Sequence, residues 1–113
     1  MLSEATRAAL MAFRHERDWE QFHTPKNLAI AISVEAGELL EQFQWTGEGA
    51  VPPQSIASEA VVHEIADVAI LLTYLATDLG VDIDAAVNLK LALNEQRYPV
   101  AKSRGNAVKH GTH

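Results

Sequence analysis

Residues 58–80, SEAVVHEIADVAILLTYLATDLG, carry the pattern that decides the fold. Apolar residues recur there at helical spacing, Ser55 or Ser58 can cap the start of a helix, and Gly80 can end it. Further apolar residues widen the apolar surface well beyond one stripe, and a helix that is apolar on most sides must be buried on most sides. We therefore expect this helix to pack between the subunits of a homo-oligomer. The alternative is a central helix in a monomeric bundle.

Three more helices are expected around this segment. Their expected spans are 4–17, 25–44 and 83–98, and their N-caps are Ser3, Thr24 and Asp82. Residues 18–23 form a connector, and residues 46–54, with two glycines and two prolines, form a loop. No strand is needed, so the fold class is all-α, with four helices and short links. We expect one domain over residues 1–100 and a flexible tail over residues 101–113.

Charge is unevenly spread along the chain. The 113 residues include 9 Lys and Arg and 15 Asp and Glu, a formal net charge of −6. No Lys or Arg occurs from Asn27 to Leu89, and these 63 residues hold ten of the acids. A nucleic-acid backbone binder needs clustered cations, so polymeric nucleic acid is not an expected partner.

Composition excludes several kinds of chemistry and location. The chain has no cysteine, which excludes a disulfide framework, thiol catalysis and any Cys-ligated metal site. Apolar runs such as Val68–Leu72 are far shorter than a membrane span, and the N-terminus lacks a basic region followed by an apolar signal core. We therefore expect a cytoplasmic location and no membrane partner.

Two pairs of acids stand among apolar residues. Glu35 and Glu38 are three apart in one expected helix, and Glu64 and Asp67 are three apart in the next. This spacing places both members of a pair on one helix face. Buried carboxylates without a partner are costly, and no Lys or Arg lies nearby in sequence. Mg²⁺, with Mn²⁺ as a substitute, is the natural partner, and phosphoryl transfer is the implied chemistry. The alternative is two exposed pairs on solvated faces.

Other candidate residues lie around these acids. Glu41 follows Glu38 by three positions and is either an outer ligand, a general base or an exposed acid, so Glu38 and Glu41 are the candidate catalytic residues. Lys90, Asn94 and Arg97 form one stripe on the last expected helix, suited to phosphates or to a solvated face. Aromatic and imidazole side chains suited to stacking on a base, or to capping the core, flank the second expected helix: Trp19, Phe22, His23 and Trp45.

Together these residues closely resemble a known family. The resemblance spans residues 10–100 and rests on seven blocks in the same order and spacing: Arg17-Asp-Trp-Glu-Gln-Phe-His23, Pro25, Asn27-Leu28, Glu35-Ala-Gly-Glu38-Leu39, Phe43-Gln-Trp45, Glu64-Ile-Ala-Asp67-Val68 and Gln96-Arg-Tyr-Pro99. The family is the MazG-like all-α nucleoside triphosphate pyrophosphohydrolases, in their dCTP pyrophosphatase branch.

The resemblance implies a Mg²⁺-dependent enzyme that cleaves a nucleoside triphosphate between its α and β phosphates, as a house-cleaning activity, in a homodimer or homotetramer. It implies metal ligands at Glu35, Glu38, Glu64 and Asp67. It also implies a nucleoside pocket lined by Trp19 through His23 and by Trp45, with Lys90, Asn94 and Arg97 near the phosphates.

Two positions depart from the dCTP-specific pattern. Such relatives place a His nine positions before Trp19 and a Tyr four positions after Asp67, where this chain has Leu10 and Leu71. The aromatic part of the pattern is intact, so a pyrimidine deoxynucleotide, dCTP or a 5-substituted dCTP, is the expected substrate.

Two other classes of function are alternatives to a nucleoside triphosphate pyrophosphohydrolase. A di-iron oxidoreductase needs Glu-x-x-His on two helices, and the chain has this motif only at Glu20 to His23, directly before a helix-starting proline. A non-catalytic helical module for nucleotide sensing or dimerisation would bind nucleotide without turnover.

Overall fold

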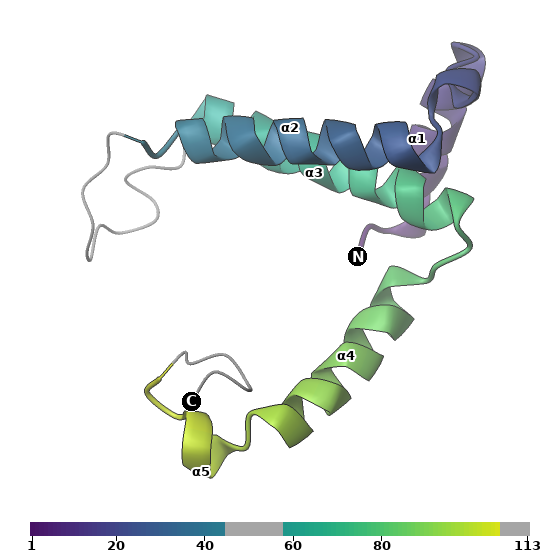
Figure 1. Cartoon of the computed structure of the whole chain (residues 1–113). Coiled ribbons are helices and arrows are strands. Elements are labelled where there is room, and N and C mark those ends of the chain that lie inside the picture. Colours follow the sequence, from purple (N-terminus) through teal and green to yellow (C-terminus); the bar gives the residue numbers. More distant parts are fainter. Residues whose placement is uncertain (45–57, 107–113) are drawn as a thin grey trace. The chain divides into compact units, whose positions relative to one another are not determined.

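The structure is a computed structural model that describes residues 1–44 and 58–106. Every regular element in these two stretches is a helix, which confirms the all-α class with four main helices. The elements are α1 (Glu4–Glu16), the 3₁₀ turn η1 (Glu20–Phe22), α2 (Pro25–Glu41), α3 (Glu59–Asp78), α4 (Ile83–Arg97) and α5 (Val100–Ser103) (Figure 1).

Capping side chains set the starts of the four main helices. Each cap accepts a hydrogen bond from the backbone N–H three residues on, and the caps are Ser3, Thr24, Ser58 and Asp82. These bonds satisfy donors that the first helical turn cannot pair. After α3 the chain turns at Gly80, whose φ of +69° is accessible to glycine at little steric cost. The predicted caps and this helix end are therefore confirmed, with Ser58 as the cap of α3.

Two short elements were not predicted from the sequence. The connector 18–23 contains η1. Helix α5 begins directly after Pro99 and includes the first three residues of the expected tail, 101–103. The predicted loop 46–54 and the alternative cap Ser55 lie outside the described residues. The expected boundary between residues 100 and 101 stays a prediction.

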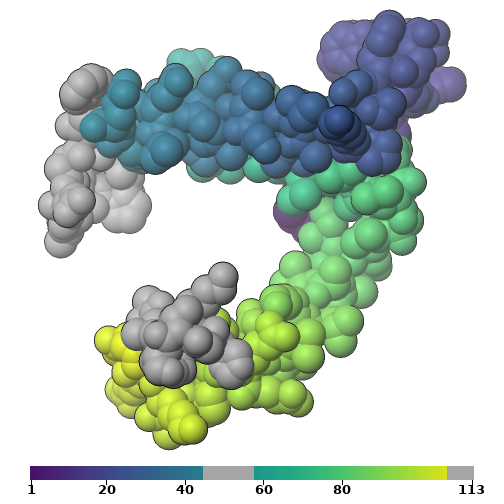
Figure 2. All heavy atoms as spheres, in the orientation of Figure 1, coloured from purple at the N-terminus to yellow at the C-terminus, as the bar shows by residue number. Residues whose placement is uncertain are grey.

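The described residues fall into two compact units, Leu2–Gly80 and Val81 onward together with Met1. In the first unit α2 and α3 run antiparallel, side by side (Figures 1 and 2). Helix α1 packs against α3. Helices α4 and α5 belong to the second unit. The α2–α3 pair is thus the scaffold that positions side chains from residues 25–41 against residues 59–78.

Two sets of polar contacts join α1 to α3. The guanidinium of Arg14 donates hydrogen bonds from both terminal nitrogens to the carboxylate of Asp78, at 2.8 Å each. The hydroxyl of Tyr74 donates to the backbone carbonyl of Leu10 at 2.9 Å. Bidentate charge-assisted bonds are among the stronger polar contacts in proteins, so they fix where α1 meets α3.

Few side chains are buried in the described part of the chain. The buried apolar residues there are Leu28, Val61, Tyr74 and Ala76. Along α3, by contrast, Val62 and Ile65 are each 55% exposed and Leu72 is 37% exposed. The apolar surface of α3 therefore exceeds what its own unit covers, as its sequence predicts.

By length and mean hydropathy (1.5), α3 is the one helix among the described residues that could cross a membrane. Its packing argues for another role, because α2 lies along it and α1 is bonded to it through Asp78 and Tyr74. It is the core helix of this unit.

We expect Leu28→Ala to destabilise the fold by about 2–5 kcal/mol, because the side chain is 1% exposed and its removal leaves a cavity. Leu28→Met conserves volume and is the matched control, with an expected loss below about 1.5 kcal/mol. Urea unfolding followed by circular dichroism measures both. Equal losses in the two variants would show that cavity formation does not govern this position.

Candidate functional site

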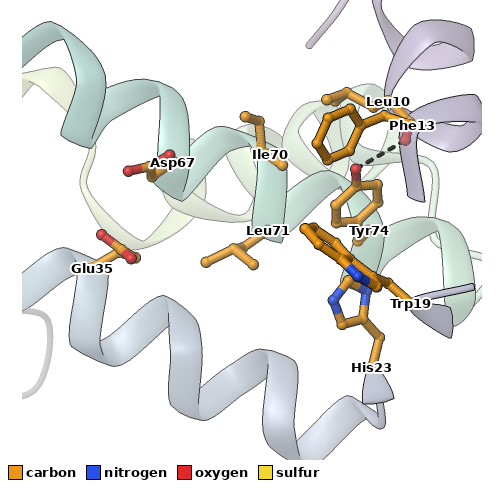
Figure 3. A pocket seen from close by; sticks show the side chains of 9 residues that line it. All are labelled: Leu10, Phe13, Trp19, His23, Glu35, Asp67, Ile70, Leu71 and Tyr74. Carbon is orange, nitrogen blue, oxygen red and sulfur yellow. Dashed lines mark hydrogen bonds between the residues drawn. The ribbon is translucent and has the colours of Figure 1, made fainter. Parts of the chain in front are cut away.

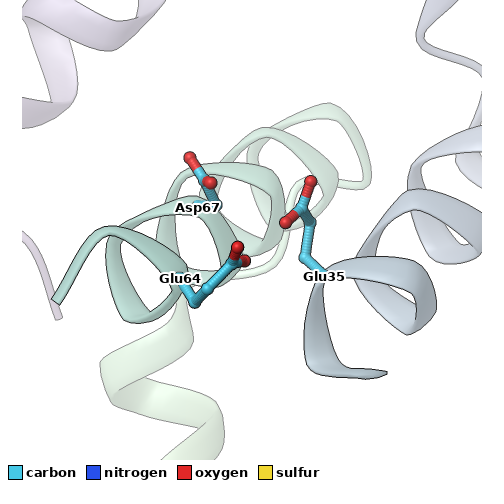
Figure 4. Close-up of side chains that lie close together, drawn as sticks. All are labelled: Glu35, Glu64 and Asp67. Atoms are coloured by element: carbon cyan, nitrogen blue, oxygen red, sulfur yellow. The ribbon is translucent and has the colours of Figure 1, made fainter. Parts of the chain in front are cut away.

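Three carboxylates from two helices meet in the α2–α3 scaffold. Glu35 comes from α2, and Glu64 and Asp67 come from successive turns of α3 (Figure 4). One ligand oxygen from each lies within 4.8 Å of the others. Antiparallel packing opposes the two helix faces, and the spacing of three between Glu64 and Asp67 keeps both on the face toward Glu35. The structure therefore brings together three of the four predicted metal ligands.

The fourth predicted ligand, Glu38, lies one turn after Glu35 on α2 and interacts electrostatically with Glu35 and Glu64. It is not part of the three-residue cluster. Glu41 is exposed and adds negative charge near Glu38. Their catalytic roles stay predictions.

Crowding of like charges shows in the acid–base properties of this cluster. Contact with the carboxyl of Glu64 raises the pKa of Glu35, and burial adds to the effect, while contact with Glu38 opposes it. Contact with the carboxyl of Glu35 likewise raises the pKa of Glu38. Neighbouring carboxylates favour a shared proton because both cannot ionise without repulsion.

The cluster also fits a hard cation. Glu35 and Glu64 each have a buried carboxylate oxygen (Oε2) with no hydrogen-bond partner among the described residues. Buried oxygens of this kind need a proton or a cation, and an all-carboxylate donor set suits Mg²⁺ or Mn²⁺. These three residues could therefore hold a divalent metal ion.

A pocket of about 390 Å³ adjoins the acids, within the Leu2–Gly80 unit. Its lining residues are Leu10, Phe13, Trp19, His23, Glu35, Asp67, Ile70, Leu71 and Tyr74 (Figure 3). Glu35 and Asp67 lie at one end, and Trp19, His23 and Tyr74 lie at the other (Figure 3). The pocket thus joins an acidic end to an aromatic end, as a ligand with a charged group and a flat ring would require.

The predicted substrate-binding residues divide into four groups. Trp19 and His23 line the pocket. Phe22 is 63% exposed and is not among the lining residues. Trp45 lies outside the described residues. The stripe of Lys90, Asn94 and Arg97 is on α4, in the other compact unit, so its proximity to phosphates stays a prediction.

Several residues that line the pocket were not predicted from the sequence. Phe13, Ile70 and Tyr74 were not predicted as site residues, yet all three line the pocket. The sequence does indicate that Tyr74 shares a helix face with Asp67, because Asp67, Leu71 and Tyr74 follow one another at spacings of four and three. Leu10 and Leu71, the two departures from the dCTP-specific pattern, also both line the pocket. Both side chains make this part of the pocket wall apolar.

A strained turn places Trp19 in the pocket. Asp18 has a φ of +54°, and Gln21 donates to both the backbone carbonyl and the carboxylate of Asp18. Non-glycine residues seldom adopt this conformation, and Asp is among those that tolerate it best. The ring of Trp19 then meets the ring of Phe13 edge to face, with 5.6 Å between ring centres. The guanidinium carbon of Arg17 lies 3.7 Å from the centre of the same Phe13 ring.

Comparison with known proteins gives one consistent result. A model of the MazG-like family matches residues 30–112. The chain is 46% identical over 101 residues to dCTP pyrophosphatase 1 of Rattus norvegicus and 43% identical over 101 residues to that of Homo sapiens. Each match covers 87% of this chain and 59% of the relative, so the chain spans about three fifths of the length of these curated relatives.

A solved structure supports the same assignment over nearly its whole length. A pyrophosphatase from Archaeoglobus fulgidus is 40% identical, with a TM-score of 0.78. The match covers 85% of this chain and 91% of that one. At this level of identity the likeness concerns sequence as well as fold.

We expect Mn²⁺ to bind the protein and Asp67→Asn to weaken that binding by about tenfold or more, since even outer partners of a metal site contribute about 10- to 100-fold. Glu59→Gln, an exposed change on the same helix, is the control and should bind like the parent. Titration calorimetry measures both. Affinity should also fall as pH drops through the raised pKa of Glu35, because a protonated carboxyl no longer attracts the cation. Equal, pH-independent binding in both variants would contradict the site.

Proposed function

The chain belongs to the MazG-like family, and from this we propose that it is a nucleoside triphosphate pyrophosphohydrolase that uses Mg²⁺. Its products would be a nucleoside monophosphate and pyrophosphate, formed by cleavage between the α and β phosphates. The observation that carries the proposal is a three-carboxylate cluster that opens onto an aromatic pocket within one unit of the chain. Cytoplasmic removal of surplus or modified pyrimidine deoxynucleotides, dCTP or a 5-substituted dCTP, is the role we propose for it.

Glu35, Glu38, Glu64 and Asp67 would hold the metal ion. Bound Mg²⁺ would neutralise triphosphate charge and polarise the attacked phosphorus, with Mn²⁺ as a substitute. The four carboxylates would repel a triphosphate unless a cation neutralised their charge, so we expect the triphosphate to lie beside the metal ion that they would hold.

A carboxylate must also take a proton from the attacking water. Water adds to the phosphorus, the bond from that phosphorus to the bridging oxygen breaks, and pyrophosphate leaves with the electron pair. Glu38 and Glu41 are the proposed acceptors, since both lie on α2 beyond Glu35.

The nucleoside would occupy the aromatic end of the pocket. Trp19 offers a ring for stacking, and His23 offers hydrogen bonds to base edges. Phe22 and Trp45 would complete the nucleoside site, and Lys90, Asn94 and Arg97 would bind the outer phosphates. The apolar wall at Leu10 and Leu71 suits a base with an apolar 5-substituent, because it offers van der Waals contact and no side-chain hydrogen bond.

The same chain would assemble as a homodimer or homotetramer. Val62, Ile65, Ala69 and Leu72 form a stripe at spacings of three, four and three along α3, of which the larger three side chains are exposed. Apolar residues at this spacing are typical of helix-to-helix packing. Each stripe residue stands two positions before a residue of the site face (Glu64, Asp67, Leu71, Tyr74), so the two faces lie about 200° apart on a helix of 3.6 residues per turn. A second copy could cover the stripe and leave the pocket open.

We expect the protein with Mg²⁺ to convert dCTP or 5-methyl-dCTP into the monophosphate and pyrophosphate, in a panel of canonical and modified nucleotides resolved by ion-exchange chromatography. Glu38→Ala and Asp67→Ala should each lower kcat by about 10²-fold or more while the helical circular dichroism persists. Glu59→Gln is the control and should retain turnover. Release of inorganic phosphate would exclude this reaction. Nucleotide binding without turnover would favour the non-catalytic module instead.

We expect the 12.3 kDa chain to sediment as a dimer or tetramer. Ile65→Asp should shift it toward the monomer, because an unpaired charge in an apolar interface costs several kcal/mol. Gln42→Asp adds the same charge at an exposed position after α2 and is the matched control. Analytical ultracentrifugation of parent and variants measures the change. A monomeric parent protein would exclude the proposed assembly.

A further inference from the structure

Arg14 is an unusual residue in the described part of the chain, because it is charged and only 6% exposed. Its carboxylate partner, Asp78, is 64 residues away in sequence, on another helix. Removing an arginine from water costs several kcal/mol unless its hydrogen bonds are replaced. Here the carboxylate of Asp78 accepts from both terminal nitrogens, while the buried Nε has no partner among the described residues. The pair does not line the pocket, so the arrangement needs an explanation besides ligand contact.

Tyr74 connects this ion pair to the pocket. The guanidinium carbon of Arg14 lies 4.6 Å from the centre of the Tyr74 ring, a cation–π distance. The hydroxyl of Tyr74 is held by the carbonyl of Leu10 at 2.9 Å. The Tyr74 ring in turn packs against the imidazole of His23, with 5.5 Å between ring centres (Figure 3). His23 thus rests on a ring that is fixed by both its face and its hydroxyl.

We infer that Arg14, Asp78 and Tyr74 form one positioning unit that holds the His23 imidazole in place at the aromatic end of the pocket. This inference rests on the proposed function for its kinetic consequence alone. The three residues act through His23 and do not themselves react.

The unit also governs the charge of His23. Groups that face it are Arg14 on α1, Glu20 on η1, and Tyr74 and Asp78 on α3. Burial lowers the pKa of His23 and the nearby charge of Arg14 lowers it further, while Asp78 and Glu20 oppose this. A neutral imidazole at pH 7 presents one donor and one acceptor, whereas a protonated one presents two donors. Its Nδ1 is buried and has no hydrogen-bond partner among the described residues.

A purely structural role for the pair predicts something different. If Arg14 and Asp78 only tie α1 to α3, their loss would lower stability and shift the His23 midpoint through the change in charge alone, while the affinity for nucleotide would stay unchanged in the folded protein. If they position His23, its titration and the KM for nucleotide must change together. Turnover of bound substrate should change little, because the acids lie at the other end of the pocket (Figure 3).

The test compares Arg14→Gln with Arg7→Gln, an arginine of the same helix whose side chain is 43% exposed and whose ion-pair partner is Glu4. NMR titration of the imidazole resonances, with His23 assigned through His23→Gln, gives its protonation midpoint without any need for turnover. We expect Arg14→Gln to raise the midpoint by about half a pH unit or more, since removing a nearby positive charge favours protonation. It should also raise the KM for dCTP by about tenfold, with kcat within about twofold. Arg7→Gln should match the parent in both.

Tyr74→Phe and Tyr74→Leu give a second comparison that leaves the ion pair intact. Phe keeps the ring under His23 and should retain a KM within about twofold of the parent, whereas Leu removes the ring and should raise KM by about tenfold. The inference is overturned if Arg14→Gln, or Tyr74→Leu where the former does not fold, leaves KM at the value of Arg7→Gln. A parent protein that turns over no nucleotide would refute the proposed function, while an unchanged His23 midpoint in Tyr74→Leu, which keeps the charges of Arg14 and Asp78, would refute the positioning role.

Discussion

Repulsion among carboxylates is the constraint on which the site depends. Packing of α2 against α3 holds oxygens of Glu35, Glu64 and Asp67 within 4.8 Å of one another. Glu35 and Glu64 each have a buried oxygen with no hydrogen-bond partner in the described part of the chain. No Lys or Arg occurs between Asn27 and Leu89, so neither α3 nor the part of α2 after Lys26 offers a cation to the site. Either protons or a divalent cation must therefore reduce the negative charge of the cluster. The raised pKa of Glu35 reflects the tendency of these carboxylates to take up a proton.

The two faces of helix α3 serve different purposes. One face of it bears Glu64, Asp67, Leu71 and Tyr74, which meet α2, the pocket and α1. The opposite face bears the apolar stripe that the unit leaves exposed. Packing within this unit therefore serves the site, and further burial of α3 requires a surface from outside the unit. The few buried residues of the described chain are consistent with this division.

The aromatic end of the pocket combines apolar side chains with the ring of Tyr74. Leu10 and Leu71 stand where dCTP-specific relatives are expected to carry polar residues, and Tyr74, one turn after Leu71, brings an aromatic ring into the same space. The Tyr74 hydroxyl is already bonded to the Leu10 carbonyl, so its ring face is the part that the pocket meets. Arg14 and Asp78 support that ring from outside the pocket.

The sequence by itself determined the all-α class, the four helix starts and the pairing of acids on helix faces, because these depend on capping residues and on a period of 3.6, which are local. It also identified Trp19 and His23, since the motif around them is contiguous. Tertiary structure decided that Glu35 meets Glu64 and Asp67 within one cluster, that Tyr74 lines the pocket, and that Arg14 finds Asp78 across 64 residues. Those contacts depend on which faces of α1, α2 and α3 oppose one another, and helical periodicity sets the faces but not their partners.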